Sequence, residues 1–248
     1  MDLCLHSRIS SLLPKEYQKL FKNKCKEMYK TPSHKSRYVY QCSFSMEKDN
    51  LALWNYYTKS SGIKGYNICF SASELSSSLE KKDPKASFKT EITHGKIIYD
   101  IRKQKSIIKN IISEFAKAID QEGADAENRE IAIPLLIDTL LAVGTFFKAP
   151  CFKHEKECRL VVRPFETYDK ENGKFFANLG KFPATYEKNG LLIPFADLKF
   201  DKCVLKGITS SPTLDFMEVQ ANLKNALRIY EYDEEKIEIC HSEIPVRY

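Results

Sequence analysis

Hydrophobic and polar positions change their spacing sharply between residues 37 and 70, and this stretch organises the chain. Apolar, aromatic and small residues dominate residues 38–44, a composition typical of a β-strand. After a polar turn, Leu51, Trp54 and one of Tyr57 or Thr58 fall at the spacing of one helical face. A second apolar run follows from Gly65 to Phe70. The pattern predicts a strand–turn–helix–turn–strand unit with a polar rim above an aromatic core.

The polar rim of this unit allows two interpretations. It consists of Ser43, Ser45, Glu47, Asp49 and Asn55. The rim is a candidate binding site because its hydroxyl, carboxylate and amide groups lie close together in the chain. Alternatively, Ser45 and Asp49 cap the helix, a common use of serine and aspartate. Residue types alone favour capping.

Helical spacing recurs in three further stretches. Residues 8–30 carry an apolar stripe, and Pro14 stands where a helix could begin. A helix from Lys103 carries isoleucines and Phe115 at intervals of one, three and four residues up to Ile119. A second long helix is expected over 129–147, buried on most sides, with Pro134 in its first turns, where proline is tolerated best.

Strand-like runs lie between and after these helices. They are expected at 96–100, 151–163, 191–195, 204–208 and 236–240, with a polar hairpin or long loop over 165–190. A last helix is expected from Thr209 to about Leu227, capped by Ser211. Because strands and helices do not alternate strictly, the order predicts an α+β fold with a mixed, mostly antiparallel sheet packed against several helices. We expect a helical segment over 1–36 and a single α+β domain over 37–248.

The composition indicates the type of protein and its cellular compartment, but it does not indicate a function. The 248 residues are 43% hydrophobic and 29% charged, as in a globular protein, and the net charge of +6 is spread along the chain. This charge permits a nucleic-acid partner without implying one. Eight cysteines without a Cys-x-x-Cys pair suit free thiols in a reducing compartment. With no signal peptide or apolar span in the sequence, we expect a cytoplasmic protein without a membrane partner.

The first candidate for chemistry is the run from Glu155 to Arg159. On a strand, alternate residues share a face, so Glu155, Glu157 and Arg159 are expected to point the same way. Two carboxylates beside an arginine can perform acid–base chemistry or bind the hydroxyls of a ribose. A solvated strand edge with weak ion pairs explains the same residues equally well.

A second candidate is the hydroxyl-rich turn before the last helix. Ser210 and Ser211 precede an expected helix N-terminus, where free amides and a partial positive charge attract phosphate. A plain capped helix is the favoured alternative. Cys151, His154 and Cys158 could contribute to a zinc site, but structural zinc needs a fourth ligand. Phosphate-binding loops, dinucleotide-binding glycine motifs and metalloprotease motifs are absent from the sequence.

Several of these pieces together resemble a known family. Cys42-Ser-Phe-Ser-Met-Glu-Lys-Asp-Asn-Leu-Ala-Leu-Trp-Asn-Tyr-Tyr57 and Gly65-Tyr-Asn-Ile-Cys-Phe70 resemble the run "C-F-S-x-x-x-D-x-L-x-x-W-x-x-Y … G-x-x-I-x-F" of a bacterial family catalogued as domain of unknown function 2971. Phe152-Lys-His-Glu-Lys-Glu-Cys-Arg-Leu-Val161 is similar to its "F-x-x-E-x-E-x-R-x-v". Ile97-Ile-Tyr-Asp100 and Val204-Leu-Lys-Gly-Ile208 are similar to two of its strands. The resemblance covers about residues 38–248.

The resemblance implies a working cluster and a class of enzyme. The cluster that the resemblance implies consists of Ser45, Asp49, Trp54, Tyr57, Glu155, Glu157 and Arg159. The family's usual first strand is similar to the NAD-binding strand of ADP-ribosyltransferase-like folds, although before Arg37 this chain has only a distant counterpart in Leu5-His6-Ser7. The resemblance thus implies an ADP-ribosyltransferase-like or NAD-consuming enzyme of toxin or phage-defence systems, with NAD as substrate, Glu157 as catalytic carboxylate, and Glu155 and Arg159 in support.

Two other functions stay open. The chain could be a non-catalytic module that binds a nucleotide or nucleic acid through its mild positive charge and the 205–213 turn. It could also be a metal-dependent nuclease in which Asp49, Glu155 and Glu157 surround a divalent ion.

Overall fold

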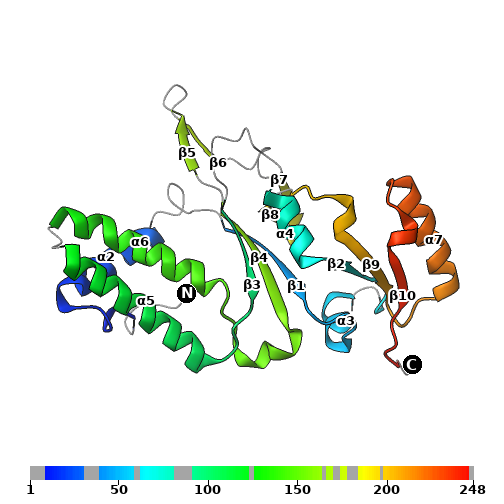
Figure 1. Cartoon of the computed structure of the whole chain (residues 1–248), viewed down its shortest axis with the longest axis horizontal. Coiled ribbons are helices and arrows are strands. Elements are labelled where there is room, and N and C mark those ends of the chain that lie inside the picture. The colour runs from blue at the N-terminus through cyan, green and yellow to red at the C-terminus, as the bar shows by residue number, and fades with distance from the viewer. Residues whose placement is uncertain are drawn as a thin grey trace. The chain divides into compact units, whose positions relative to one another are not determined.

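The chain forms two compact units, each assembled from separate stretches of sequence (Figure 1). The computed structural model describes residues 9–30, 39–58, 62–80, 91–122, 126–163, 166–169, 174–177, 184–195 and 198–245. The first unit comprises Met1–Val39 and Gly95–His154, and the second comprises Tyr40–His94 and Glu155–Tyr248. The expectation of a helical segment over 1–36 and a single α+β domain over 37–248 stays a prediction.

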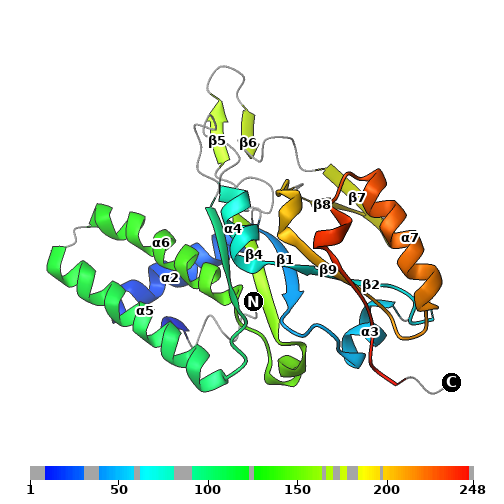
Figure 2. The same cartoon turned by 45° about the vertical axis from the view of Figure 1, so that its right-hand side comes forward.

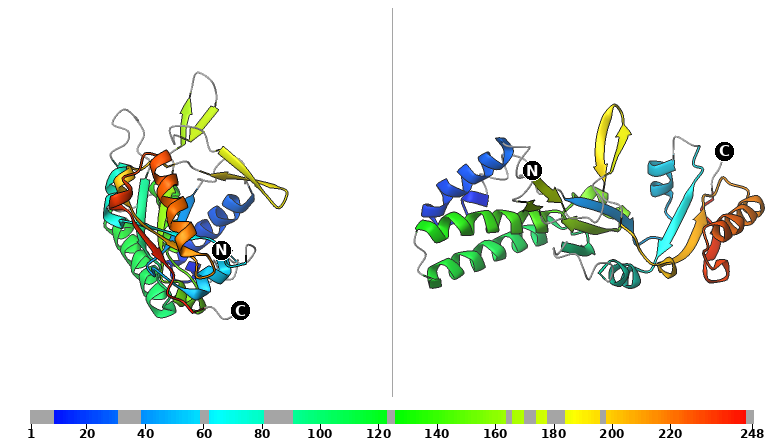
Figure 3. Two further views of the ribbon diagram at one scale, coloured as in Figure 1. Left: turned by 90° about the vertical axis from the view of Figure 1, so that its right-hand side faces the viewer. Right: turned by 90° about the horizontal axis from the view of Figure 1, so that it is seen from above.

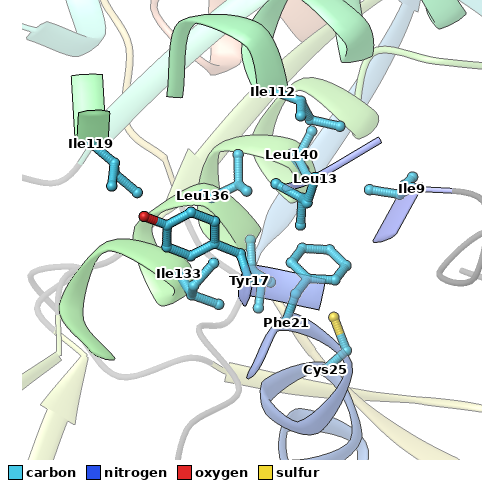
Figure 4. Close-up of a cluster of buried hydrophobic side chains, with 11 residues drawn as sticks. Ile9, Leu13, Tyr17, Phe21, Cys25, Ile112, Ile119, Ile133, Leu136 and Leu140 are labelled. Atoms are coloured by element: carbon cyan, nitrogen blue, oxygen red, sulfur yellow. The ribbon is translucent and has the colours of Figure 1, made fainter. Parts of the chain in front are cut away.

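Helices build the first unit. They are α2 (Lys15–Lys30), α5 (Ile101–Glu122) and α6 (Ala126–Gly144), which lie side by side (Figure 2). Figure 4 shows the core between them, where apolar side chains from all three helices and from residues 9–13 meet. Tyr17 packs edge-on against Phe115 with ring centroids 6.4 Å apart. The expected helical stripes of 8–30 and 103–119 are therefore confirmed.

The third expected helix differs in two ways. Helix α6 begins at Ala126, so Pro134 lies in its interior instead of its first turns. Ile133, Leu136, Ile137 and Leu140 are buried, but Ile131 and Leu135 are 60% and 59% exposed. The expectation of burial on most sides is wrong, because the buried residues of α6 pack with α2 and α5 while Ile131, Leu135 and Thr139 are exposed.

Two three-stranded sheets form the frame of the second unit. One has the order β1-β4-β3, with β1 (Tyr40–Ser45) antiparallel to β4 (Glu157–Arg163) and β3 (Glu91–Lys96) on the other side of β4. The other has the order β10-β9-β2 and joins β2 (Tyr66–Phe70), β9 (Leu205–Ser210) and β10 (Glu238–His241). Strand β9 runs antiparallel to β2 and parallel to β10. The mixed, mostly antiparallel α+β fold is confirmed.

Short helices and hairpins complete this unit (Figure 3). The helices are α3 (Leu51–Thr58), α4 (Ala72–Glu80) and α7 (Phe216–Ile229), with single 3₁₀ turns at η3 (Lys202–Val204) and η4 (Glu234–Lys236). Two antiparallel hairpins are formed by β5 (Glu166–Asp169) with β6 (Lys174–Ala177), and by β7 (Ala184–Lys188) with β8 (Leu191–Phe195). Within the described ranges, no helix is long and apolar enough to cross a membrane.

Two expected strands are placed differently. The strand expected at 96–100 is β3 (Glu91–Lys96), and only Ile98 continues it, through a single bridge to Phe147. Asp100 instead caps α5 by accepting a hydrogen bond from the amide of Lys103 at 2.8 Å. The first part of the expected strand 151–163 is a 3₁₀ helix, η2 (Pro150–Glu155), and β4 begins only at Glu157.

Candidate functional site

A carboxylate held by two neighbouring side chains lies at the start of β4. Ser43 donates a hydrogen bond to Glu157 Oε1 over 2.6 Å, and Arg159 Nε donates to the same oxygen over 2.6 Å. Arg159 Nη2 reaches Glu157 Oε2 at 3.3 Å. The antiparallel register explains the arrangement, because it places Ser43 opposite Arg159 and Ser45 opposite Glu157. All four residues therefore share one face of the sheet.

Burial sets this ion pair apart from the surface pairs of the chain. The side chains of Glu157 and Arg159 are 5% and 12% exposed. Removing two charges from water costs several kcal/mol per ion, and a buried pair is often no more stable than apolar side chains of similar size. The stability of the fold therefore gives little reason for a buried ion pair at this position.

The opposite face of the same sheet is aromatic. Phe44 in β1 packs edge-on against Phe70 of β2, with ring centroids 6.0 Å apart. Phe70 packs in turn against Phe200 at 5.4 Å. These contacts fix β1 from behind, so the polar face that carries Ser43 and Ser45 has a packed support.

Glu155 does not lie on the strand face that the sequence predicts. It ends η2, and Lys156 between it and β4 has a φ of 42°, in the left-handed region. This backbone turn breaks the two-residue periodicity on which the expectation of a shared face rested. The backbone carbonyl of Glu155 accepts a hydrogen bond from Ser45 Oγ over 2.9 Å, and the amide of Met46 donates to the carbonyl of Lys156. The hydroxyl of Ser45 thus fixes the backbone of the two residues that precede Glu157.

Asp49 occupies a separate group of contacts. Its Oδ1 accepts a hydrogen bond from the indole of Trp54 at 2.6 Å, and both carboxylate oxygens accept from Ser242 Oγ, at 2.9 and 2.8 Å. The amide of Glu243 donates to Oδ2 at 2.9 Å. Asp49 therefore ties the turn before α3 to the segment that follows β10.

The cap of α3 is neither Ser45 nor Asp49. Asn50 Oδ1 accepts the amides of Ala52 and Leu53, at 2.9 and 3.4 Å, so the capping alternative for the two predicted residues is wrong. Trp54 is buried, and Tyr57 is 75% exposed. Trp54 consequently supports the unit from inside, while Tyr57 is open to solvent.

Ser210 is the last residue of β9, Ser211 follows it directly, and neither lies at a helix terminus. Both are fully buried, and Ser210 Oγ lies 2.9 Å from Nδ1 of His241. Ser211 Oγ accepts the amide of Gly65 at 3.3 Å. Helix α7 is capped by Asp215 instead, whose carboxylate accepts the amides of Met217 and Glu218. The expected Ser211 cap is wrong, because the chain makes a further turn before the helix begins.

A surface ion pair joins the loop after β1 to β10. Lys48 Nζ lies 3.1 Å from Glu238 Oε2 and 3.7 Å from Cys240 Sγ. Hydrogen bonds from Cys240 and then from Lys48 lower the pKa of the Glu238 carboxyl below its usual value. Partial burial raises the pKa of the Cys240 thiol. This cysteine is therefore protonated at neutral pH.

Metal ligation finds no support in this arrangement. Among the residues that the structure describes, no group of three or more His, Cys, Asp or Glu side chains is placed to hold a metal ion. The Asp49 carboxylate is engaged with Trp54, Ser242 and Glu243, while Glu157 is engaged with Ser43 and Arg159. The nuclease alternative thus lacks a ligand set in the described part of the chain.

The sequence analysis does not predict the contacts that Ser43, Asn50 and Ser242 make in these groups. Ser43 was noted only as part of the polar rim, although its register opposite Arg159 makes it the partner of Glu157. Ser242 lies 193 residues from Asp49, and no local signal connects the two. Asn50 could have been found, because asparagine directly before an apolar helix is a strong capping signal.

Comparison with known proteins supports the resemblance of the motifs. Residues 53–160 match a family model described as "Protein of unknown function (DUF2971)". This is the family that the motifs resemble, and the matched stretch contains Trp54, Tyr57, Glu155, Glu157 and Arg159. No curated protein and no solved structure matches the chain significantly.

Proposed function

We propose that the chain is an NAD-consuming enzyme of the ADP-ribosyltransferase-like class, in which Glu157 is the catalytic carboxylate. The observation that carries the proposal is the fixed position of this carboxylate, which Ser43 and Arg159 hold at one oxygen with separations of 2.6 Å. A negative charge held in place in a site of low solvent exposure interacts strongly with a positive charge that develops beside it. Cleavage of the nicotinamide–ribose bond develops such a charge.

The reaction needs only NAD and an acceptor, which is water or another group with a reactive oxygen. The bond between C1′ of the ribose and the nicotinamide nitrogen breaks, and its electron pair leaves with nicotinamide. An oxygen of water, or of an acceptor group, bonds to C1′ and releases one proton. Glu157 stabilises the oxocarbenium-like transition state by its charge, while Ser43 and Arg159 position the carboxylate.

The neighbouring residues support substrate contact on the same face. Ser45 lies opposite Glu157 and is exposed, so it is placed to meet a ligand that reaches the carboxylate. Glu155 ends η2 two residues before Glu157 and does not share this strand face, and we assign it a supporting role. We assign Asp49 and Trp54 a supporting role, because the hydrogen bond between their side chains holds the α3 region in place.

The binding-module alternative is less well supported. It relies on the mild positive charge and on the 205–213 turn, and in that turn Ser210 and Ser211 are fully buried and precede α7 by several residues. The enzyme is therefore the better supported of the two.

Release of nicotinamide from NAD by the purified full chain tests the proposal. We expect the wild-type chain to release nicotinamide, and we expect Glu157→Asp to lower the rate by about 100-fold. The aspartate keeps the charge that balances Arg159 but withdraws the carboxylate by one methylene. Glu114→Gln is the matched control, since Glu114 is an exposed carboxylate of α5 that pairs with Lys117 at the surface.

Binding separates a wrong substrate from a wrong catalytic residue. NAD at about 100 times its dissociation constant stabilises a folded protein by about 2.7 kcal/mol, which is visible as a rise in melting temperature. A wild-type chain that melts cooperatively but neither shifts with NAD nor releases nicotinamide contradicts the proposal. Full activity in Glu157→Asp assigns the chemistry to another residue.

A further inference from the structure

Net positive charge is concentrated in the first unit. Although basic residues are spread along the chain, Met1–Val39 and Gly95–His154 contain 18 of the 39 Lys and Arg residues but only 11 of the 33 Asp and Glu residues, a net charge of +7. The second unit has the remaining 21 basic and 22 acidic residues, a net charge of −1. Attraction of an anionic partner at long range is therefore a property of the helical unit.

Helix α2 presents part of this charge as a row along one side. Exposed lysines at positions i, i+4, i+7 and i+11 form this row, the lysine stripe, which consists of Lys15, Lys19, Lys22 and Lys26. At 3.6 residues per turn the four lie within an arc of about 60° around the helix. Tyr17, Phe21 and Cys25 lie outside this arc and are buried in the core of the unit. The lysine stripe therefore faces solvent.

Helix stability does not explain the lysine stripe. Like charges three or four residues apart on a helix repel each other, and the stripe contains three such pairs in succession. The arc holds no acidic residue, and within the described ranges none of the four lysines forms an ion pair. Lys24, by contrast, lies outside the arc and pairs with Glu27 at 3.6 Å. Charges that oppose helix formation suit a partner that neutralises them.

We infer that the lysine stripe binds the phosphate backbone of a double-stranded nucleic acid, independently of its base sequence. The stripe extends over about 16 Å of the helix axis, the length of about five successive phosphates of one duplex strand. A row of this length suits a repeated anion better than a single phosphate group. Lysine is a flexible point charge, and its contacts with phosphates carry no base information.

Other anionic partners fit the lysine stripe less well. Proteins that bind single strands stack the bases on aromatic side chains, but Tyr17 and Phe21 of α2 are each only 2% exposed. A helix that binds an anionic membrane inserts apolar residues beside its lysines, whereas Leu20 and Phe21 pack in the core. The stripe belongs to the helical unit, and the inference does not depend on the reaction proposed at Glu157.

Fluorescence anisotropy of the full chain with short labelled duplexes of mixed sequence tests this inference. Four phosphate contacts predict a slope of about −3.6 for the logarithm of the association constant against that of the salt concentration. Binding should therefore weaken about 100-fold between about 50 and 200 mM salt. A DNA duplex and an RNA duplex are compared, and binding to either one with this slope supports the inference and identifies the preferred backbone.

Two double variants with the same change in charge separate the stripe from the net charge. Lys19→Gln with Lys22→Gln should reduce the slope to about −1.8. Lys24→Gln with Lys117→Gln removes as much charge outside the stripe and should keep the wild-type slope. Melting temperature serves as the folding control, and the stripe variant should not melt earlier, because glutamine favours helices and the change relieves repulsion.

Lys19→Arg with Lys22→Arg keeps both charges and should bind like the wild type, which checks the stripe without removing charge. A wild-type chain that binds neither duplex at low salt overturns the inference. An equal loss of binding in the two glutamine double variants also overturns it, because binding would then follow the net charge and not the lysine stripe.

Discussion

The carboxylate of Asp49 accepts the indole N–H of Trp54 at 2.6 Å, and this bond fixes the turn in front of α3. The same carboxylate accepts Ser242 Oγ and the amide of Glu243, so it also holds the segment after β10. One side chain thus connects the start of the second unit with the end of the described chain. These bonds show that Asp49 joins two distant segments, while a substrate contact at Asp49 stays a prediction.

Asp49→Ala is expected to destabilise the protein by about 3 kcal/mol. Hydrogen bonds to a charged group contribute about 1.5–3 kcal/mol each, and their losses are not additive. Urea unfolding measures the change, and amide hydrogen exchange should show faster exchange in α3 and around Ser242. Ser45→Ala, which removes an exposed hydroxyl, is the control and should cost less. Equal stability of Asp49→Ala and the wild type would contradict the supporting role.

Local patterns in the sequence were sufficient for most elements and for the fold class. Helical spacing predicts α5, and short strand-like runs predict β8, β9 and β10. The capping residues were harder, because Ser211 has the right residue type but Asp215 stands where α7 begins. Type and position must both match for a cap, and only type is visible without knowing where the helix starts.

The parts of the site that the sequence does not predict depend on contacts between residues far apart in the chain. Glu157 and Arg159 were identified from a two-residue spacing, which survives because both lie in β4. The same spacing predicts that Glu155 shares this strand face, and that prediction is wrong because Lys156 adopts a left-handed backbone, which is uncommon for a lysine. The partners Ser43 and Ser242 come from distant strands and required the register of the sheets.

Asp215→Ala should cost about 1 kcal/mol, because α7 loses the acceptor for the amides of Met217 and Glu218. Asp215→Asn keeps an acceptor of equal capping quality and should cost only a few tenths of that value. Chemical denaturation compares the two variants under the same conditions. A loss of the same size in both variants would show that the charge of Asp215, and not its cap, stabilises the helix.

Cys25 should make the stability of the first unit depend on alkaline pH. Burial raises the pKa of this thiol from its ordinary value of 9.0 to about 11. Between these pH values the unfolded chain loses the thiol proton while the folded chain keeps it, so stability falls as pH rises from 9 and levels off above 11. Melting temperatures of the wild type and Cys25→Ala should therefore converge over this window. A constant difference between them would contradict burial as the cause.

The buried pair of Glu157 and Arg159 allows a double-mutant test of the candidate site. Arg159→Met leaves the Glu157 carboxylate buried without its guanidinium partner, and we expect a loss of about 3–5 kcal/mol in the free energy of unfolding. Glu157→Leu should likewise be costly alone, because it leaves Arg159 uncompensated. The double variant replaces both charges by apolar groups and should lose much less than the sum of the single variants. Urea unfolding of all four proteins measures this coupling. Additive losses would mean that the two charges do not act as a pair, and Glu157 would then lose the positioning on which its proposed catalytic role depends.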